Sequence, residues 1–176
     1  MKLPHLRLKN FLSDIIHIVK YFNSPTNGKM SETDVLLDIK KFVITNKEDV
    51  FRIIIGTDSL SNHESCNFVT AIVVHRIGSG AKYYWRKQNK KMKPVLRTKI
   101  YEETMISLNV AKDFVPKLQK NLNGSKYDFE IHIDVGNVGP TREMIKEVVG
   151  MVTGNGFVAK TKPQSWGASS VADRYT

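Results

Sequence analysis

The stretch Phe51–Ser59, FRIIIGTDS, decides the fold of this chain. Three consecutive isoleucines predict a buried β-strand, because β-branched side chains fit a pleated surface. Gly56 ends the apolar run, so Asp58 stands where a core strand emerges from the protein. Taken alone, Asp58 is explained equally well as a turn or helix-cap residue, since Asp and Ser side chains bond the backbone there. The other acidic residues of the chain shift the balance toward a functional role.

Length and composition set the broad class. A chain of 176 residues with 41% hydrophobic residues is most simply one globular domain. One cysteine, Cys66, excludes an internal disulfide framework and fits a reducing compartment. The sequence has no apolar run near the ~20 residues of a membrane span. Its basic N-terminus is not followed by an unbroken apolar stretch, because Asp14 and His17 interrupt it. We therefore expect a cytoplasmic protein with no membrane partner.

The net charge of +10 has an uneven distribution along the chain. The segment Lys82–Lys99 contains eight basic residues and no acidic residue, whereas the rest of the chain is nearly balanced. Such a concentration is typical of a surface that binds a polyanion. A solvated loop without a partner is the alternative. The aromatic residues Tyr83, Tyr84 and Trp85 lead into the run and add groups that could stack on bases, which favours nucleic acid.

The first 48 residues are expected to form a helical extension. Apolar spacing predicts a weak helix over residues 1–21, and Asn23–Gly28 is a turn cluster. Ser31 is placed to cap a second helix, with Asp34 three residues further on. We therefore expect one domain, 1–176, in which an extension of residues 1–48 packs on a core of residues 49–176.

The remaining pattern predicts an α/β fold with a five-stranded mixed sheet flanked by helices. The expected strands are 51–59, 67–76, 81–87, 128–135 and 157–160. The expected helices of this part are 96–118, 140–153 and a last one within 169–176. Three consecutive strands indicate an antiparallel meander, and the two later strands, each reached through a helix, indicate parallel crossovers.

Asp58 and Asp134 both lie near the C-terminal ends of predicted strands. If those strands are parallel neighbours, the two carboxylates lie about one strand spacing apart. Like charges that close repel, and a divalent cation between them would relieve the repulsion. Oxygen ligands favour Mg²⁺ or Mn²⁺.

Two further acids could complete this cluster. Glu103 lies on the apolar face of its predicted helix, where an unpaired carboxylate is not expected, and its neighbour Glu102 is the weaker alternative. Asp173 lies near the start of the last helix. Each acid also has a simple structural explanation: Glu103 could pair with Lys99, Asp134 could cap a turn, and Asp173 could be exposed at a frayed end. Together these explanations are less attractive, because one topology brings all four acids to the same place.

Four segments resemble a known family. They are GTDS after the first strand, LRTKIYEET, HIDVGNVGPTREMIKEVVG and KPQSWGASSVADRYT. The chain from Val35 to Thr176 resembles the ribonuclease H-like family of small bacterial proteins typified by the Bacillus protein YkuK. The resemblance implies a ribonuclease H-like fold with nuclease activity, and an acid at each of four matching positions. These positions are Asp58, Glu103 (or Glu102), Asp134 and Asp173. Leu60 stands where the family often has Gln, so a polar role at that position is not expected.

The leading hypothesis is phosphodiester hydrolysis of nucleic acid with two bound Mg²⁺ or Mn²⁺ ions, about 4 Å apart. Asp58 would bridge both ions, Glu103 and Asp134 would hold one, and Asp173 the other. Basic side chains would hold the phosphate backbone without reading its sequence. The candidates are Arg86, Lys87, Lys90, Lys91, Lys93, Arg97 and Lys162. RNA, DNA and a hybrid are all open as substrates, and the oligomeric state is open too.

Two other functions compete with this hypothesis. A nucleic-acid-binding module could keep the fold and the metal pocket but turn over little substrate. Phosphotransfer is a distant third, because the actin-like kinases that also carry Gly-Thr-Asp duplicate this fold, and the chain has room for one copy. His132 is expected to be structural, and His63 to be exposed in a loop.

Overall fold

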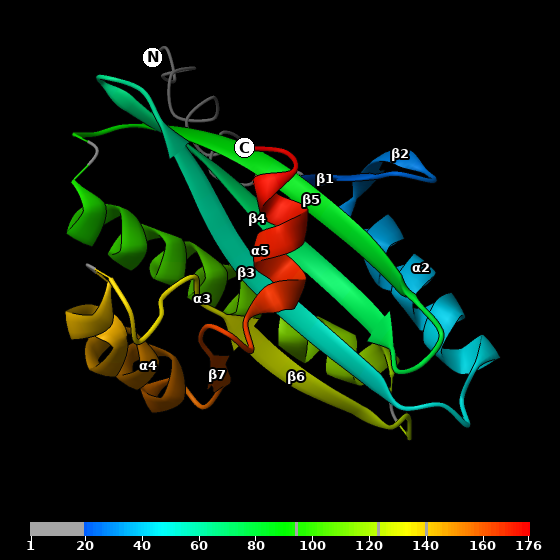
Figure 1. Ribbon diagram of the computed structural model, residues 1–176. Coiled ribbons are helices and arrows are strands. Elements are labelled where there is room, and N and C mark those ends of the chain that lie inside the picture. Colours follow the sequence, from blue (N-terminus) through cyan, green and yellow to red (C-terminus); the bar gives the residue numbers. More distant parts are fainter. Residues whose placement is uncertain (1–19, 94, 123, 140) are drawn as a thin grey trace, which may run out of the picture.

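A computed structural model describes residues 20–176 of the chain, except residues 94, 123 and 140 (Figure 1). The helix expected over residues 1–21 falls almost wholly outside this range. In chain order the elements are β1 (Tyr21–Ser24), β2 (Gly28–Ser31), α2 (Glu32–Thr45), β3 (Phe51–Ser61), β4 (Ser65–Arg76), β5 (Ala81–Lys91), α3 (Leu96–Asn121), β6 (Tyr127–His132), the 3-10 helix η1 (Arg142–Met144), α4 (Ile145–Gly154), β7 (Val158–Lys160) and α5 (Trp166–Asp173).

The mixed sheet that the sequence predicted is confirmed. Its strand order is β2-β1-β5-β4-β3-β6-β7. Strands β3, β4 and β5 form an antiparallel meander, β6 runs parallel to β3, and β7 runs parallel to β6. Because a parallel neighbour requires a crossover, β6 and β7 are each reached through helices, as the sequence order indicated.

The expected number of five strands was wrong, because the sheet has seven. Strands β1 and β2 form an antiparallel hairpin in the segment where we expected a turn between two helices. β1 continues the sheet beyond β5 through the pairing of Asn23 with Trp85. Each of these strands has only four residues. Strands this short depend on pairing with β5, which no local sequence pattern reports.

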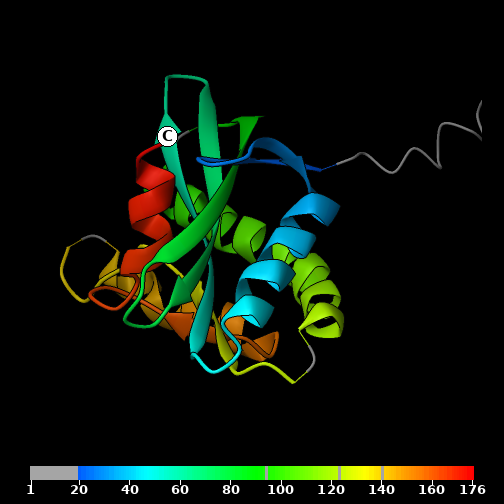
Figure 2. The same ribbon diagram turned by 90° about the vertical axis from the view of Figure 1, so that its right-hand side faces the viewer.

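Helices cover the two faces of the sheet unequally. Figure 2 shows α5 on one face and α2 and α3 on the other. Alternation along β3 accounts for this: Ile53 and Ile55 belong to the large core beneath α2 and α3, whereas Ile54 belongs to a smaller cluster beneath α5. The three isoleucines of the deciding stretch are all fully buried.

Helix α5 lies unusually close to β3. A Cβ atom added at Gly56 would lie 2.4 Å from the Cβ of Ala168, and one added at Gly167 would lie 2.7 Å from Cδ1 of Ile54. Real Cβ contacts this short are essentially never found. The two glycines therefore allow α5 to rest directly on the strand that carries Asp58.

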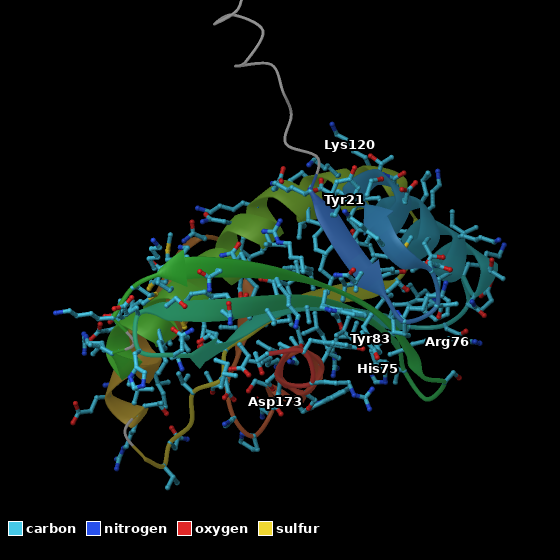
Figure 3. The ribbon with its side chains drawn as sticks, turned by 90° about the horizontal axis from the view of Figure 1, so that it is seen from above. Tyr21, His75, Arg76, Tyr83, Lys120 and Asp173 are labelled. Carbon is cyan, nitrogen blue, oxygen red and sulfur yellow. The ribbon has the colours of Figure 1, made fainter. Side chains whose placement is uncertain are left out.

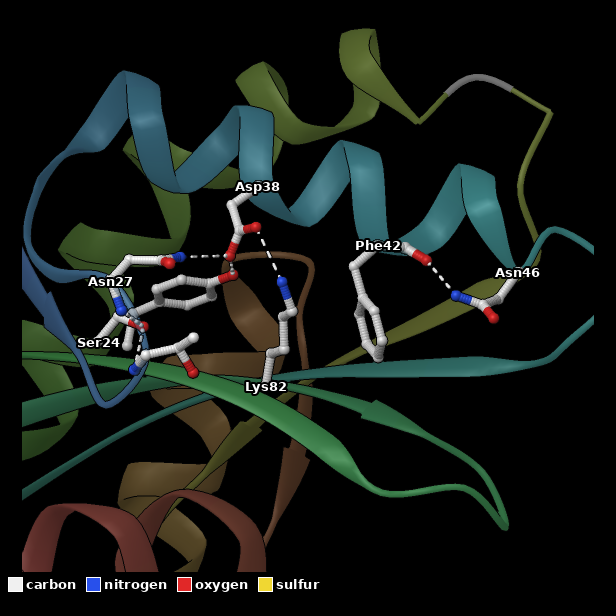
Figure 4. Close-up of polar contacts among 8 residues, drawn as sticks. Ser24, Asn27, Asp38, Phe42, Asn46 and Lys82 are labelled. Atoms are coloured by element: carbon white, nitrogen blue, oxygen red, sulfur yellow. Dashed lines mark hydrogen bonds and ion pairs between the residues drawn. The ribbon is translucent and has the colours of Figure 1, made fainter.

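Helix α2 begins as the sequence predicted, and it is anchored to β5. Ser31 caps it in a capping box with Asp34. Further along the helix, Asp38 accepts hydrogen bonds from Lys82 Nζ at 2.8 Å and from the buried Tyr84 hydroxyl at 2.6 Å (Figure 4). Burial of Asp38 raises its pKa, but these two hydrogen bonds outweigh burial and leave the pKa below its usual value. This cluster is therefore explained as an anchor for α2.

Candidate active site

Asp58 and Asp134 come together at the end of the β3–β6 pairing. The last paired residues are Gly56 and His132, and each aspartate lies two residues further along its strand direction. Residues two apart on a strand lie on the same side of the sheet, so both aspartates belong to the side that α5 covers. Both line a cleft of about 300 Å³. The expectation that their strands are parallel neighbours is confirmed.

Glu103 enters this cleft from α3. Its side chain is buried, with 7% of the residue exposed, and Ser59 Oγ donates a hydrogen bond to its Oε1 at 2.5 Å. Glu102 instead forms an ion pair with Lys90 outside the cleft. Of the two alternatives left open by the sequence, the structure therefore brings Glu103 into the cleft.

Burial, together with the charges of neighbouring acids, raises the pKa values of Glu103 and Asp58. The pKa of Glu103 rises to about 8, first because of burial and then because of the charges of Asp58 and Asp134, against the opposing effects of Ser59 and Lys99. The pKa of Asp58 is also raised, mainly by burial, with added repulsion from Asp134 and Asp173. The cleft therefore disfavours the charged forms of Glu103 and Asp58 in the metal-free protein.

Asp173 is placed differently from the other three acids. It is the last residue of α5 and is exposed; Figure 3 labels it beside that helix. It is close enough to raise the pKa of Asp58, yet it does not line the cleft. The structure thus gathers Asp58, Glu103 and Asp134 and leaves Asp173 at the rim.

Two lysines share the cleft with the acids. Lys162 Nζ forms an ion pair with Asp134 Oδ1 at 2.8 Å, and Lys99 Nζ donates to the Ser59 carbonyl at 3.3 Å. The backbone positions Lys162: its N–H donates to the Val135 carbonyl at 2.8 Å. From the sequence, Lys99 was expected to belong to the basic run or to pair with Glu103, because helical spacing does not reveal its proximity to β3.

The donor chemistry of the cleft fits a hard divalent cation. Its three carboxylates supply only oxygen ligands, and the partner of the buried Asp134 Oδ1 among the described residues is the Lys162 ammonium group. Across residues 20–176 without the three omitted positions, no three His, Cys, Asp or Glu side chains are arranged to hold a metal ion. A cation would therefore have to draw the carboxylates together and displace Lys162.

The basic run does not form the single loop patch that we expected. β5 continues to Lys91 instead of ending at Lys87, so strand alternation divides the basic side chains between the two faces of the sheet. Arg86 packs over the Phe22 ring at 5.4 Å on the side of α2, and burial lowers its pKa. Lys90 and Arg97 are engaged in ion pairs with Glu102 and Glu147 respectively. Lys90 is exposed as well, and the other exposed lysines of this segment are Lys87, Lys91 and Lys93.

The aromatic residues before the basic run are also divided. Tyr84 is fully buried beneath α2, so it cannot stack on a ligand. Tyr83 and Trp85 point to the other face, where Trp85 stacks on Tyr175 with ring centroids 3.8 Å apart and Tyr83 pairs with Tyr175 through their hydroxyl groups. Their main contacts therefore hold the C-terminal end of the chain against β5.

His132 and His63, the two histidines considered from the sequence, lie outside the cleft, as expected. His132 is buried, its Nδ1 accepts from the Gly167 N–H at 3.3 Å, and its Nε2 therefore carries the proton that faces Glu130 Oε2 at 3.0 Å. Burial lowers the pKa of His132, which keeps it neutral. His63 is exposed in the turn between β3 and β4 and does not line the cleft.

The fold and the cleft define an α/β protein with a cluster of acids at the carboxyl ends of two parallel central strands. Residues 34–176 match the family model described as Ribonuclease H-like. The chain is also 32% identical over 166 residues to the uncharacterized protein YkuK of Bacillus subtilis (strain 168), covering 88% of this chain and 96% of that protein. The chain therefore belongs to the ribonuclease H-like family. The comparison with solved structures gave no match.

In the described part of the chain, no helix combines the length and the apolar character that crossing a bilayer requires.

Proposed function

We propose that this protein is a nuclease that hydrolyses phosphodiester bonds with Mg²⁺ or Mn²⁺. The observation that carries the proposal is the convergence of Asp58, Glu103 and Asp134 in one cleft, with Glu103 buried. A buried carboxylate beside two others is costly unless a cation compensates it. Membership of the ribonuclease H-like family supports the same conclusion.

The residues of the cleft divide the work as follows. Asp58 lines the cleft with Glu103 and Asp134, its charge raises the pKa of Glu103, and it is suited to contact two cations. Asp173 at the rim would complete the second position. When bound, the cations would acidify a water and stabilise the leaving oxygen. Lys99 and Lys162 supply positive charge for the phosphate, and Ser59 orients Glu103.

Cleavage of labelled single-stranded, duplex and hybrid oligonucleotides, with Mn²⁺ and with EDTA, tests this proposal. We expect Mn²⁺-dependent products from the wild type and a loss of at least about 100-fold in Asp58→Asn and Glu103→Gln. Glu102→Gln is the matched control, because Glu102 is next to Glu103 in the sequence but its own carboxylate lies outside the cleft. Equal losses in Glu102→Gln and Glu103→Gln, or cleavage that survives in Asp58→Asn, would contradict the assignment.

The position of Lys162 favours one alternative, a nucleic-acid-binding module with little turnover. Its ammonium group already neutralises Asp134, so the cleft has a counter-charge without any metal. This alternative expects oligonucleotide binding by the wild type, and the same binding by Asp58→Asn, with no products at any Mn²⁺ concentration.

A further inference from the structure

The strands β3, β4 and β5 extend beyond the helix that covers them. In Figure 1 the β3–β4 hairpin and the end of β5 project past α5. Cross-strand pairing places Asp58, Val69 and Lys87 in one row, and Leu60, Asn67 and Asn89 in the next. Val69 is buried in the cluster under α5, so its row marks where the cover ends. We call the area beyond it the open face. It consists of Leu60, Asn67, Lys87, Asn89 and Lys91, with Asp58 at its border.

The open face combines positive charge with groups suited to bases. Lys87 and Lys91 are exposed and form no ion pair within the described part of the chain, unlike Lys90 on the opposite face. Asn89 Nδ2 donates to Asn67 Oδ1 at 2.6 Å, which leaves the outer amide atoms of the pair for a ligand. Leu60, 59% exposed, adds an apolar surface between these amides and Asp58.

We propose that the open face binds a single polynucleotide strand and leads it to the acid cleft. Charge complementarity identifies the ligand as a polyanion, because Lys87 and Lys91 are exposed and form no ion pair with an acid of the described residues. A single strand opens the faces and the pairing edges of its bases to an apolar side chain and an amide pair, so these groups favour a single strand over a duplex. Leu60, for which no polar role was expected, is thereby assigned an apolar contact with the bases. The inference deepens the proposed nuclease function. It rests on that function only for the claim that the bound strand continues into the acid cleft.

Fluorescence anisotropy with a labelled single-stranded oligonucleotide in EDTA tests this inference independently of hydrolysis. We expect Lys87→Gln combined with Lys91→Gln to weaken binding about tenfold and to lower the slope of log Kd against log salt by about 1.4, for two lost phosphate contacts. The control, Lys112→Gln combined with Lys120→Gln, makes the same charge change on α3. Lys120 lies across the molecule from Asp173 (Figure 3). We expect this control to bind as the wild type does.

Leu60→Ser tests whether the open face binds a single strand or a duplex. We expect it to weaken binding of the single-stranded probe several-fold and to leave binding of a duplex of the same sequence unchanged. Wild-type affinity in the Lys87/Lys91 variant, equal losses in both lysine pairs, no binding by the wild type, or a preference for duplex would overturn the inference. Binding through the open face without cleavage would instead contradict only the proposed nuclease activity.

Discussion

Lys162 Nζ lies 2.8 Å from Asp134 Oδ1, so the acid cleft contains its own cation. A divalent metal ion at Asp134 must compete with this ammonium group. We therefore predict that Lys162→Met binds Mn²⁺ about tenfold more tightly than the wild type, because the competitor is removed. Titration calorimetry measures the effect directly. The same variant should cleave more slowly, since it lacks a phosphate contact.

Lys146→Met on α4 is the matched control for this effect. Lys146 is exposed and does not line the cleft, so the variant should bind Mn²⁺ as the wild type does. Weaker Mn²⁺ binding in Lys162→Met would show that Lys162 does not compete with the metal.

Asp58 is expected to reduce the stability of the metal-free protein. Its carboxylate is partly buried beside two other acids, and its raised pKa means that ionisation is unfavourable in the folded state. We predict that Asp58→Asn raises the free energy of unfolding in EDTA by about 1 kcal/mol at pH 7.5. Chemical denaturation measures this, with Asp128→Asn, an exposed position on β6, as the neutral control. Destabilisation by Asp58→Asn would indicate that the acids do not repel one another.

The sequence predicted the central strands and the meeting of Asp58 with Asp134, because both follow from local patterns and a chirality rule. Residues 51–56 predict a buried strand, and the helix before the fourth strand allows that strand to run parallel to it. The structure shows that the two strands are in fact neighbours. The choice of Glu103 over Glu102 also follows from helical spacing, because one of them must face the apolar side.

Three other long-range contacts were not predictable from the sequence. The hairpin β1–β2 exists because β5 offers an edge to it, and the strand that continues to Lys91 is held by β4. This continuation leaves Arg86 partly buried and Lys87 exposed, although the charges of the two residues are the same. The ion pair of Lys162 with Asp134 likewise depends on backbone contacts between segments far apart in the chain.

Glu103 is expected to make the metal-free protein less stable as pH rises. Its carboxyl has a pKa of about 8 in the folded state, against an ordinary value of 4.5. Between these values the folded state keeps a proton that the unfolded state has lost, so stability falls with increasing pH, by at most about 1.4 kcal/mol per pH unit. Below pH 4.5 and above pH 8 this contribution is constant.

Unfolding by denaturant in EDTA from pH 5 to 9 measures this pH dependence. We expect Glu103→Gln, which cannot ionise, to show a flatter profile than the wild type and to gain on it as pH rises. Glu102→Gln should retain the wild-type slope. Parallel profiles for the wild type and Glu103→Gln would mean that Glu103 titrates as an ordinary exposed acid.

The contact between Gly56 and Ala168 is expected to control both stability and the site. A Cβ at position 56 would lie 2.4 Å from Ala168 Cβ and 3.0 Å from the His132 carbonyl oxygen, so α5 or β6 would have to move. We predict that Gly56→Ala lowers the free energy of unfolding by about 2–3 kcal/mol. It should also weaken Mn²⁺ binding, because β3 carries Asp58, α5 carries Asp173, and the added Cβ would push these two elements apart. Gly150→Ala is the control, since a Cβ there meets nothing within 4 Å and a helical alanine should add up to about 1 kcal/mol of stability. If Gly56→Ala were as stable as the wild type, the close packing of α5 on β3 would be wrong.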